Sequence, residues 1–93
     1  MKYKQIIFSG HAIQRMFERA ISKTDVLEVF DAGEIIASYP DDKPFPSFLM
    51  LGFVKGRPLH VVSAVEKERE TYYVITAYDP DIGIWDQSFK KRR

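Results

Sequence analysis

Hydrophobic residues recur with two different periods along the chain, one in the first 33 residues and another after them. In the first part they return every three or four positions, which is typical of the buried side of a helix. This pattern predicts helices at residues 11–21 and 23–32, with Ser9 and Ser22 as N-caps and Gly33 as a left-handed C-terminal stop. The predicted buried side of the first helix consists of Ile13, Met16, Phe17, Ala20 and Ile21.

After residue 33 the chain is rich in β-branched and aromatic residues, separated by proline, glycine and charged turns. We expect strands at residues 34–39, 47–54, 59–66 and 71–78, preceded near the N-terminus by a short strand at 3–8. Residues 82–93 are expected to form an irregular arm or a helical turn docked on the body. Helices followed by hairpin-linked strands indicate an α+β fold, with two N-terminal helices packed on one face of a four- to five-stranded antiparallel sheet.

The length and composition indicate a single domain spanning residues 1–93. Hydrophobic residues make up 45% of the chain, which excludes a disordered protein, and the lack of cysteine excludes disulfides and thiolate metal sites. The longest uncharged stretch, residues 44–54, is much too short to span a bilayer, and no targeting segment is visible. We therefore expect a cytoplasmic protein without membrane contact.

Positive charge is concentrated at the end of the sequence. The net charge is +1, but Lys90, Lys91, Arg92 and Arg93 hold four of the fourteen basic residues. Residues 1–89 therefore carry ten bases against thirteen acids, a net charge of −3. Contact with RNA would need a local basic patch, such as the first helix together with a basic C-terminal tail at residues 90–93. The alternative is that this tail is a disordered, solvated end.

The first predicted helix carries the most informative polar residues. His11, Arg15 and Arg19 are four residues apart, so they lie on successive turns of one side. A phosphate could bind there, between the free N–H groups of the helix N-terminus and Arg15. The alternative is a solvated helix face, in which Glu18 is an ion-pair partner of these basic groups.

His60 is the second of two histidines and falls on a predicted strand. Alternation places it on one face with Val62 and Ala64, and Leu59 and Val61 on the other. One possibility is a partly buried histidine whose hydrogen bonds are satisfied. The other is that the sheet brings His60 to the side chains of the first helix. Two imidazoles and two guanidiniums suit the cleavage of a phosphodiester by acid–base chemistry and charge stabilisation.

Tyrosines mark the last predicted strand. Alternation places Tyr72, Val74, Thr76 and Tyr78 on one face. Exposed tyrosines can stack on bases, whereas the alternative is aromatic packing within the sheet. Tyr78, just before Asp79-Pro80, is the strongest functional candidate among them. We expect no metal and no cofactor, because the two histidines and the carboxylates lack ligand spacing and there is no glycine-rich phosphate loop.

The order of these motifs resembles a known family. The chain has His-x-x-x-Arg-x-x-x-Arg at residues 11–19, Pro-Leu-His-Val-Val at 58–62, Thr-Ala-Tyr-Asp-Pro-Asp at 76–81, and then Trp85, Phe89 and Arg92-Arg93. It resembles a bacterial and archaeal family of small proteins of unknown function, often encoded beside a zinc-finger antitoxin-like protein. That family is similar to the RelE-like toxin superfamily, whose fold also occurs in barnase-like and colicin-type ribonucleases.

The resemblance implies a toxin that cleaves RNA without a metal and is held in check by an antitoxin protein. On this reading His11, Arg15, His60 and Tyr78 are the catalytic residues, and Arg19, Thr76 and Arg92 bind the substrate. The chain departs from the strongly basic ribosome-dependent toxins, because residues 1–89 are net acidic. A non-catalytic protein-binding module, an inactive RelE-like relative and an orphan structural domain are the alternatives.

Overall fold

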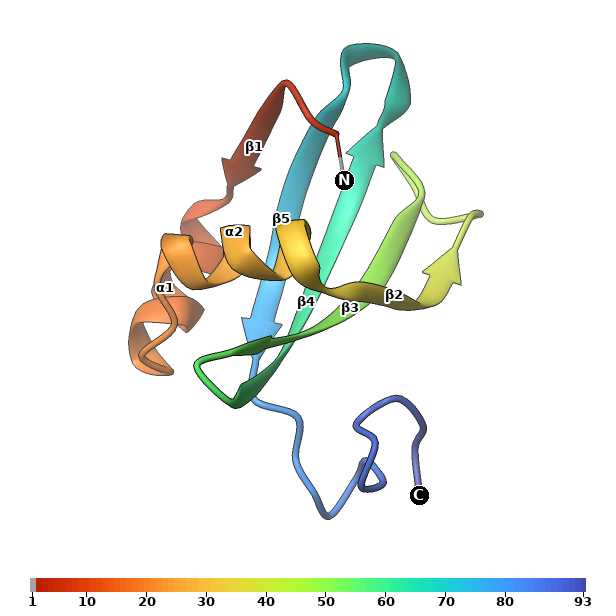
Figure 1. Cartoon of the computed structure of the whole chain (residues 1–93). Helices are drawn as coiled ribbons and strands as arrows, with labels where there is room; N and C mark the ends of the chain where they lie inside the picture. Colours follow the sequence, from red (N-terminus) through yellow and green to blue (C-terminus); the bar gives the residue numbers. More distant parts are fainter. Residues whose placement is uncertain (1) are drawn as a thin grey trace.

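The computed structural model describes residues 2–93, and within them five strands form one sheet with two helices on one of its faces (Figure 1). The elements are β1 (Gln5–Phe8), α1 (Gly10–Glu18), α2 (Lys23–Ala32), β2 (Glu34–Tyr39), β3 (Ser47–Val54), β4 (Arg57–Glu66), a 3₁₀ turn (Lys67–Arg69) and β5 (Thr71–Tyr78). The strand order is β1-β5-β4-β3-β2. The predicted α+β class is confirmed, and of the predicted domain 1–93 only Met1 lies outside the described residues.

The sheet is mixed rather than purely antiparallel, which corrects one part of the prediction. β1 pairs with β5 in parallel, with Gln5 opposite Thr71 and Phe8 opposite Val74, whereas the other three pairings are antiparallel. The reason is topological. The helices and three further strands separate β1 from β5 along the chain, so no hairpin forces the two strands to run in opposite directions.

The helix starts agree with the sequence, whereas the stop after α2 does not. Ser9 accepts a hydrogen bond from the backbone N–H of Ala12 at 3.0 Å, and Ser22 forms a reciprocal capping box with Asp25. Gly33 ends α2 in extended backbone, not in the predicted left-handed conformation. Glycine is needed there for close approach, because a Cβ would lie 2.6 Å from the carbonyl oxygens of Val29 and Leu51.

The buried side of α1 is rotated from the predicted one. Ala12 and Met16 are buried, whereas Ile13 is 42% and Phe17 86% exposed. The physical reason is the position of α1 at the edge of the sheet, where it packs mainly on β5 and buries only a narrow stripe. α2 instead buries Val26, Val29 and Phe30 over β3 and β4.

A bulge in β5 changes which tyrosines share a face. Val62 pairs with Thr76 but the next residue of β4, Ser63, pairs with Val74, so Ile75 is an extra residue. Tyr72 therefore packs against Phe30 on the helix side, while Tyr78 contacts His60 on the face without helices. The prediction that Tyr72 and Tyr78 share a face is wrong, because strict alternation does not survive an inserted residue.

The residues after β5 form an ordered arm, here called the C-terminal arm (residues 79–93). It folds back on itself, with the backbone N–H of Asp86 donating to Lys91 at 2.9 Å and that of Arg93 donating to Ile84 at 2.8 Å. Lys90 pairs with Glu34 of β2 at 2.8 Å. The four basic residues at positions 90–93 thus belong to a docked arm. Neither α1 nor α2, the helices of residues 2–93, is long and apolar enough to cross a membrane.

Candidate functional site

His60 is completely buried on the helix-free face of the sheet, beneath the C-terminal arm. Its Nε2 lies 2.7 Å from the carbonyl oxygen of Phe89 and its Nδ1 3.2 Å from the hydroxyl of Tyr78. The ring packs edge-on against Trp85, with centroids 4.5 Å apart. Because a carbonyl only accepts, Nε2 carries the proton of the neutral imidazole and Nδ1 accepts from the Tyr78 hydroxyl. Burial lowers the pKa of His60, which favours this neutral form, although the Phe89 carbonyl acts in the opposite direction.

Tyr78 is the half-buried partner of this pair and ends β5. Burial raises the pKa of its phenol above the usual value, and the neighbouring Tyr39 adds to this rise. The guanidiniums of Arg92 and Arg19 partly offset this rise in the pKa of Tyr78, because positive charge stabilises a phenolate. Two basic groups from opposite ends of the sequence therefore act on one phenol.

Arg19 follows the last residue of α1 and reaches across the edge of β5. β1 pairs with residues 71–74 of β5, and beyond this pairing Arg19 donates from Nη1 to the carbonyl of Ala77 at 2.8 Å and to Oγ1 of Thr76 at 3.2 Å. Both bonds use Nη1, so Nε and Nη2 of the guanidinium fork are not engaged in them. The structure thus brings together Arg19 and Thr76, which the sequence analysis predicted as substrate-binding residues, next to Tyr78.

Arg57 is a residue of this region that the sequence analysis missed. Its guanidinium makes a bidentate pair with Asp79, at 2.7 and 2.9 Å, and also donates to the carbonyls of Arg19 and Ala20, each at 2.8 Å. Hydrogen bonding to Asp79 raises the pKa of Arg57, and Arg57 in turn lowers the pKa of the Asp79 carboxyl. Arg57 therefore fixes the end of α1 to the start of the C-terminal arm, on either side of Tyr78. No local sequence signal links residues this far apart in the chain.

His11 and Arg15 lie apart from His60. Both are exposed on α1, and Arg15 pairs with Glu18 at 3.4 Å. His11 and Arg19 are about 12 Å apart along the helix, given a rise of about 1.5 Å per residue. His60 faces away from the helices, because its neighbours Leu59 and Val61 occupy the core on the helix side. The expected convergence of His11, Arg15 and His60 on one phosphate is therefore not found, and the catalytic role of His11 and Arg15 stays a prediction.

Arg92 belongs to the arm that covers His60. Its guanidinium lies over the ring of Trp85, 5.4 Å from the centroid, and its backbone pairs with that of Trp85. In residues 2–93, no three histidine, aspartate or glutamate side chains are grouped closely enough to hold a metal ion. The gathered groups are thus Arg19, Thr76, His60, Tyr78 and Arg92, five of the seven predicted site residues.

Comparison with known protein families identifies the family of this chain. The model of the family described as a domain of unknown function, DUF4258, matches residues 8–79. The chain belongs to the DUF4258 family. No curated protein and no solved structure matches it. The DUF4258 match runs from Phe8 at the end of β1 to Asp79, so it includes Arg57 and Tyr78 and stops before Trp85 and Arg92.

Proposed function

We propose that this DUF4258 domain is a RelE-like toxin that cleaves RNA without a metal and is restrained by an antitoxin protein. The observation that carries the proposal is the hydrogen-bonded Tyr78–His60 pair, with the guanidiniums of Arg19 and Arg92 acting on the same phenol. A proton acceptor beside two positive groups is what cleavage of a phosphodiester needs. The resemblance of the ordered motifs to RelE-like toxins supports the same activity.

In the proposed reaction Tyr78 contacts the RNA and His60 acts through it. The Tyr78 oxygen takes the proton of a ribose 2′-hydroxyl while its own proton passes to Nδ1 of His60, which is neutral and already accepts that hydrogen bond. The 2′-oxygen then forms a bond to phosphorus and the bond to the 5′-oxygen breaks. Water protonates the leaving oxygen, and the hydroxide that remains takes the proton back from His60 through Tyr78, which restores the neutral pair. Arg19 and Arg92 stabilise the charge that develops on the phosphate. The products are a 2′,3′-cyclic phosphate and a 5′-hydroxyl.

The experiment compares two tyrosine-to-phenylalanine variants on the same strand. Tyr78→Phe removes the reacting hydroxyl, so RNA cleavage should fall at least about 100-fold, the usual contribution of acid–base catalysis. Tyr72→Phe removes a hydroxyl on the helix side of the sheet, where Tyr72 packs on Phe30 and Phe48, and should cleave like the parent. Equal rates for the parent and Tyr78→Phe would contradict the proposal, as would a parent chain without cleavage.

The antitoxin is proposed to dock on α1, because this helix exposes two large apolar side chains. Ile13 and Phe17 are four residues apart, hence neighbours on the helix surface, and Phe17 is 86% exposed. The same surface favours a second candidate function, a protein-binding module without catalysis.

Growth of cells that co-express the chain with a zinc-finger antitoxin-like protein, of the kind often encoded beside members of the resembled family, tests this docking surface. The Phe17→Ser variant should no longer be inhibited by the antitoxin, so it should arrest growth. The Ile82→Ser variant changes another exposed apolar residue, on the C-terminal arm, and should remain inhibited. If neither chain arrests growth but only Phe17→Ser loses the partner in a binding measurement, the protein-binding module is the better function.

A further inference from the structure

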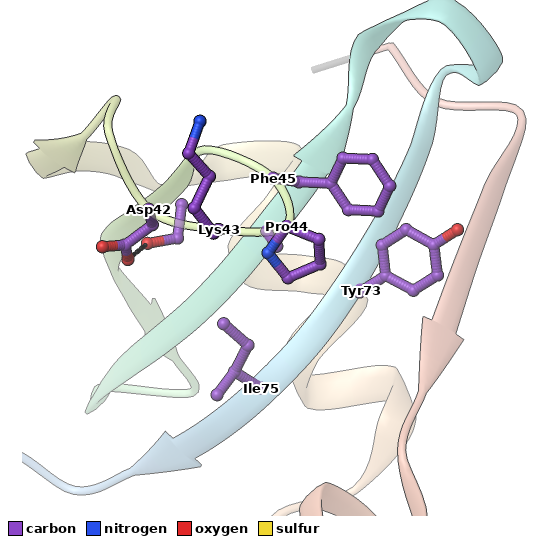
Figure 2. A pocket seen from close by; sticks show the side chains of 8 residues that line it. Asp42, Lys43, Pro44, Phe45, Tyr73 and Ile75 are labelled. Carbon is purple, nitrogen blue, oxygen red and sulfur yellow. Dashed lines mark hydrogen bonds between the residues drawn. The ribbon is translucent and has the colours of Figure 1, made fainter.

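A pocket of about 380 Å³ lies on the helix-free face, between the sheet and the loop that joins β2 to β3 (Figure 2). Its floor exists because small side chains meet large ones across the strands. Ser47 of β3 pairs with Ala64 of β4, and Ala64 pairs with Tyr73 of β5, so two small residues leave a hollow beside the tyrosine. The volume is within the range of small-molecule sites in proteins.

The loop forms the roof of the pocket and is held in place by contacts with the sheet. Phe45 stacks on Tyr73, with ring centroids 5.6 Å apart and an interplanar angle of 4°. The hydroxyl of Ser47 donates to Asp42 at 2.5 Å, and the Pro46 carbonyl accepts from the backbone N–H of Val65 at 2.9 Å. These contacts tie both ends of the loop to the sheet, so the pocket is formed before any ligand arrives.

The walls combine flat apolar surface with one carboxylate. Pro44 and the 45%-exposed Ile75 form apolar walls, and Asp42 and Lys43 supply the charged groups (Figure 2). Asp42 uses Oδ2 for Ser47, and a carboxylate has further lone pairs that only accept. The ligand should therefore be flat, largely apolar, and bear N–H donors on one edge.

The pocket continues the candidate site along the same face. Ile75 and Tyr78 both lie on β5, about 10 Å apart at about 3.3 Å per residue. An extended RNA strand whose phosphate lies at Tyr78 would cross this distance within a few nucleotides.

We propose that this pocket binds a guanine base of the RNA strand that lies across Tyr78; this inference rests on the proposed function. Guanine presents two adjacent donors, N1–H and the N2 amino group, which fit a carboxylate. Adenine, cytosine and uracil each place an acceptor beside the donor, and that acceptor repels the Asp42 oxygens. Lys43 at the rim is a partner for a neighbouring phosphate.

The test measures binding of fluorescent 2′-O-methyl oligonucleotides, which the proposed reaction cannot cleave. The oligonucleotides contain one guanine, one hypoxanthine (which lacks the N2 amino group) or only uracil. The parent should bind the guanine strand about tenfold more tightly than the other two, the effect of one hydrogen bond to a charged group. Asp42→Asn keeps an acceptor for Ser47 and should lose the preference. Asp41→Asn makes the same charge change outside the pocket and should retain it.

The two proposals fail in different ways. Affinities within twofold for all three strands, or loss of the preference in Asp41→Asn as well, would overturn the guanine pocket even if the chain cleaves RNA. A guanine preference that depends on Asp42 supports the pocket even if the chain cleaves nothing, which would refute only the proposed chemistry. A preference for an apolar peptide over every oligonucleotide would assign the pocket to a protein partner and overturn the inference.

Discussion

Removing the guanidinium of Arg57 should destabilise the whole domain, because one side chain connects α1, β4 and the C-terminal arm. Arg57→Ala loses the bidentate pair with Asp79 and two bonds to the backbone carbonyls at the end of α1. The ion pair is partly exposed, with 35% of the Arg57 and 51% of the Asp79 side chain accessible, so solvent screens it to under about 1 kcal/mol. Each bond to a carbonyl adds roughly 0.5–1.5 kcal/mol.

Together these losses give about 2 kcal/mol. For a domain of this size that corresponds to a fall in Tm of about 8–16 °C, measured by circular dichroism. Arg57→Lys keeps the positive charge but lacks the planar guanidinium, so its Tm should lie between those of the parent and Arg57→Ala. Arg69→Ala is the matched control, since Arg69 pairs only locally with Glu66 at 3.2 Å and is 77% exposed. Equal Tm values for Arg57→Ala and Arg69→Ala would refute the role assigned to Arg57.

Two further perturbations follow from burial. Because the pKa of His60 is lowered in the folded state, the unfolded chain binds a proton near pH 6.5, whereas the folded chain binds it only at lower pH. The free energy of unfolding should therefore decrease as pH falls below about 6.5 and stay constant above it. Thermal melts between pH 5 and 8 measure this, and the slope should vanish in a folded His60→Gln variant but persist in His11→Ala; a slope retained without His60 would refute the assignment. Phe17→Ser should change the free energy of unfolding, measured by urea titration, by under about 0.5 kcal/mol, whereas Phe30→Ala should reduce it by about 3–5 kcal/mol. Comparable losses would mean that Phe17 is buried after all.

Local chemistry made most of the fold predictable. The serine caps, the proline and glycine turns and the β-rich segments each depend on neighbouring residues, and the structure has α2, β2, β3 and β5 at the predicted bounds. The errors arise where the tertiary arrangement decides. Which flank of α1 is buried depends on its place at the sheet edge, and the face of Tyr78 depends on one inserted residue, Ile75.

The candidate site was predictable in its residue types but not in its grouping. Alternation correctly placed His60 on the other face of the sheet from Leu59 and Val61. It could not indicate which of the two faces the helices cover. The charge of Arg92 acts on Tyr78 only because the C-terminal arm folds back over His60, and periodicity cannot predict the path of an irregular segment. Arg57 was missed because its partners lie on two distant parts of the chain, the end of α1 and the start of the C-terminal arm.

The most direct measurement of the central claim is the chemistry at the ends of cleaved RNA. A labelled oligoribonucleotide is incubated with the full chain in the presence of a chelator, beside the same strand with a 2′-O-methyl group on every ribose. We expect 2′,3′-cyclic phosphate and 5′-hydroxyl ends from the first strand and no cleavage of the second. Products with 5′-phosphate ends, or cleavage of the methylated strand, would contradict this expectation.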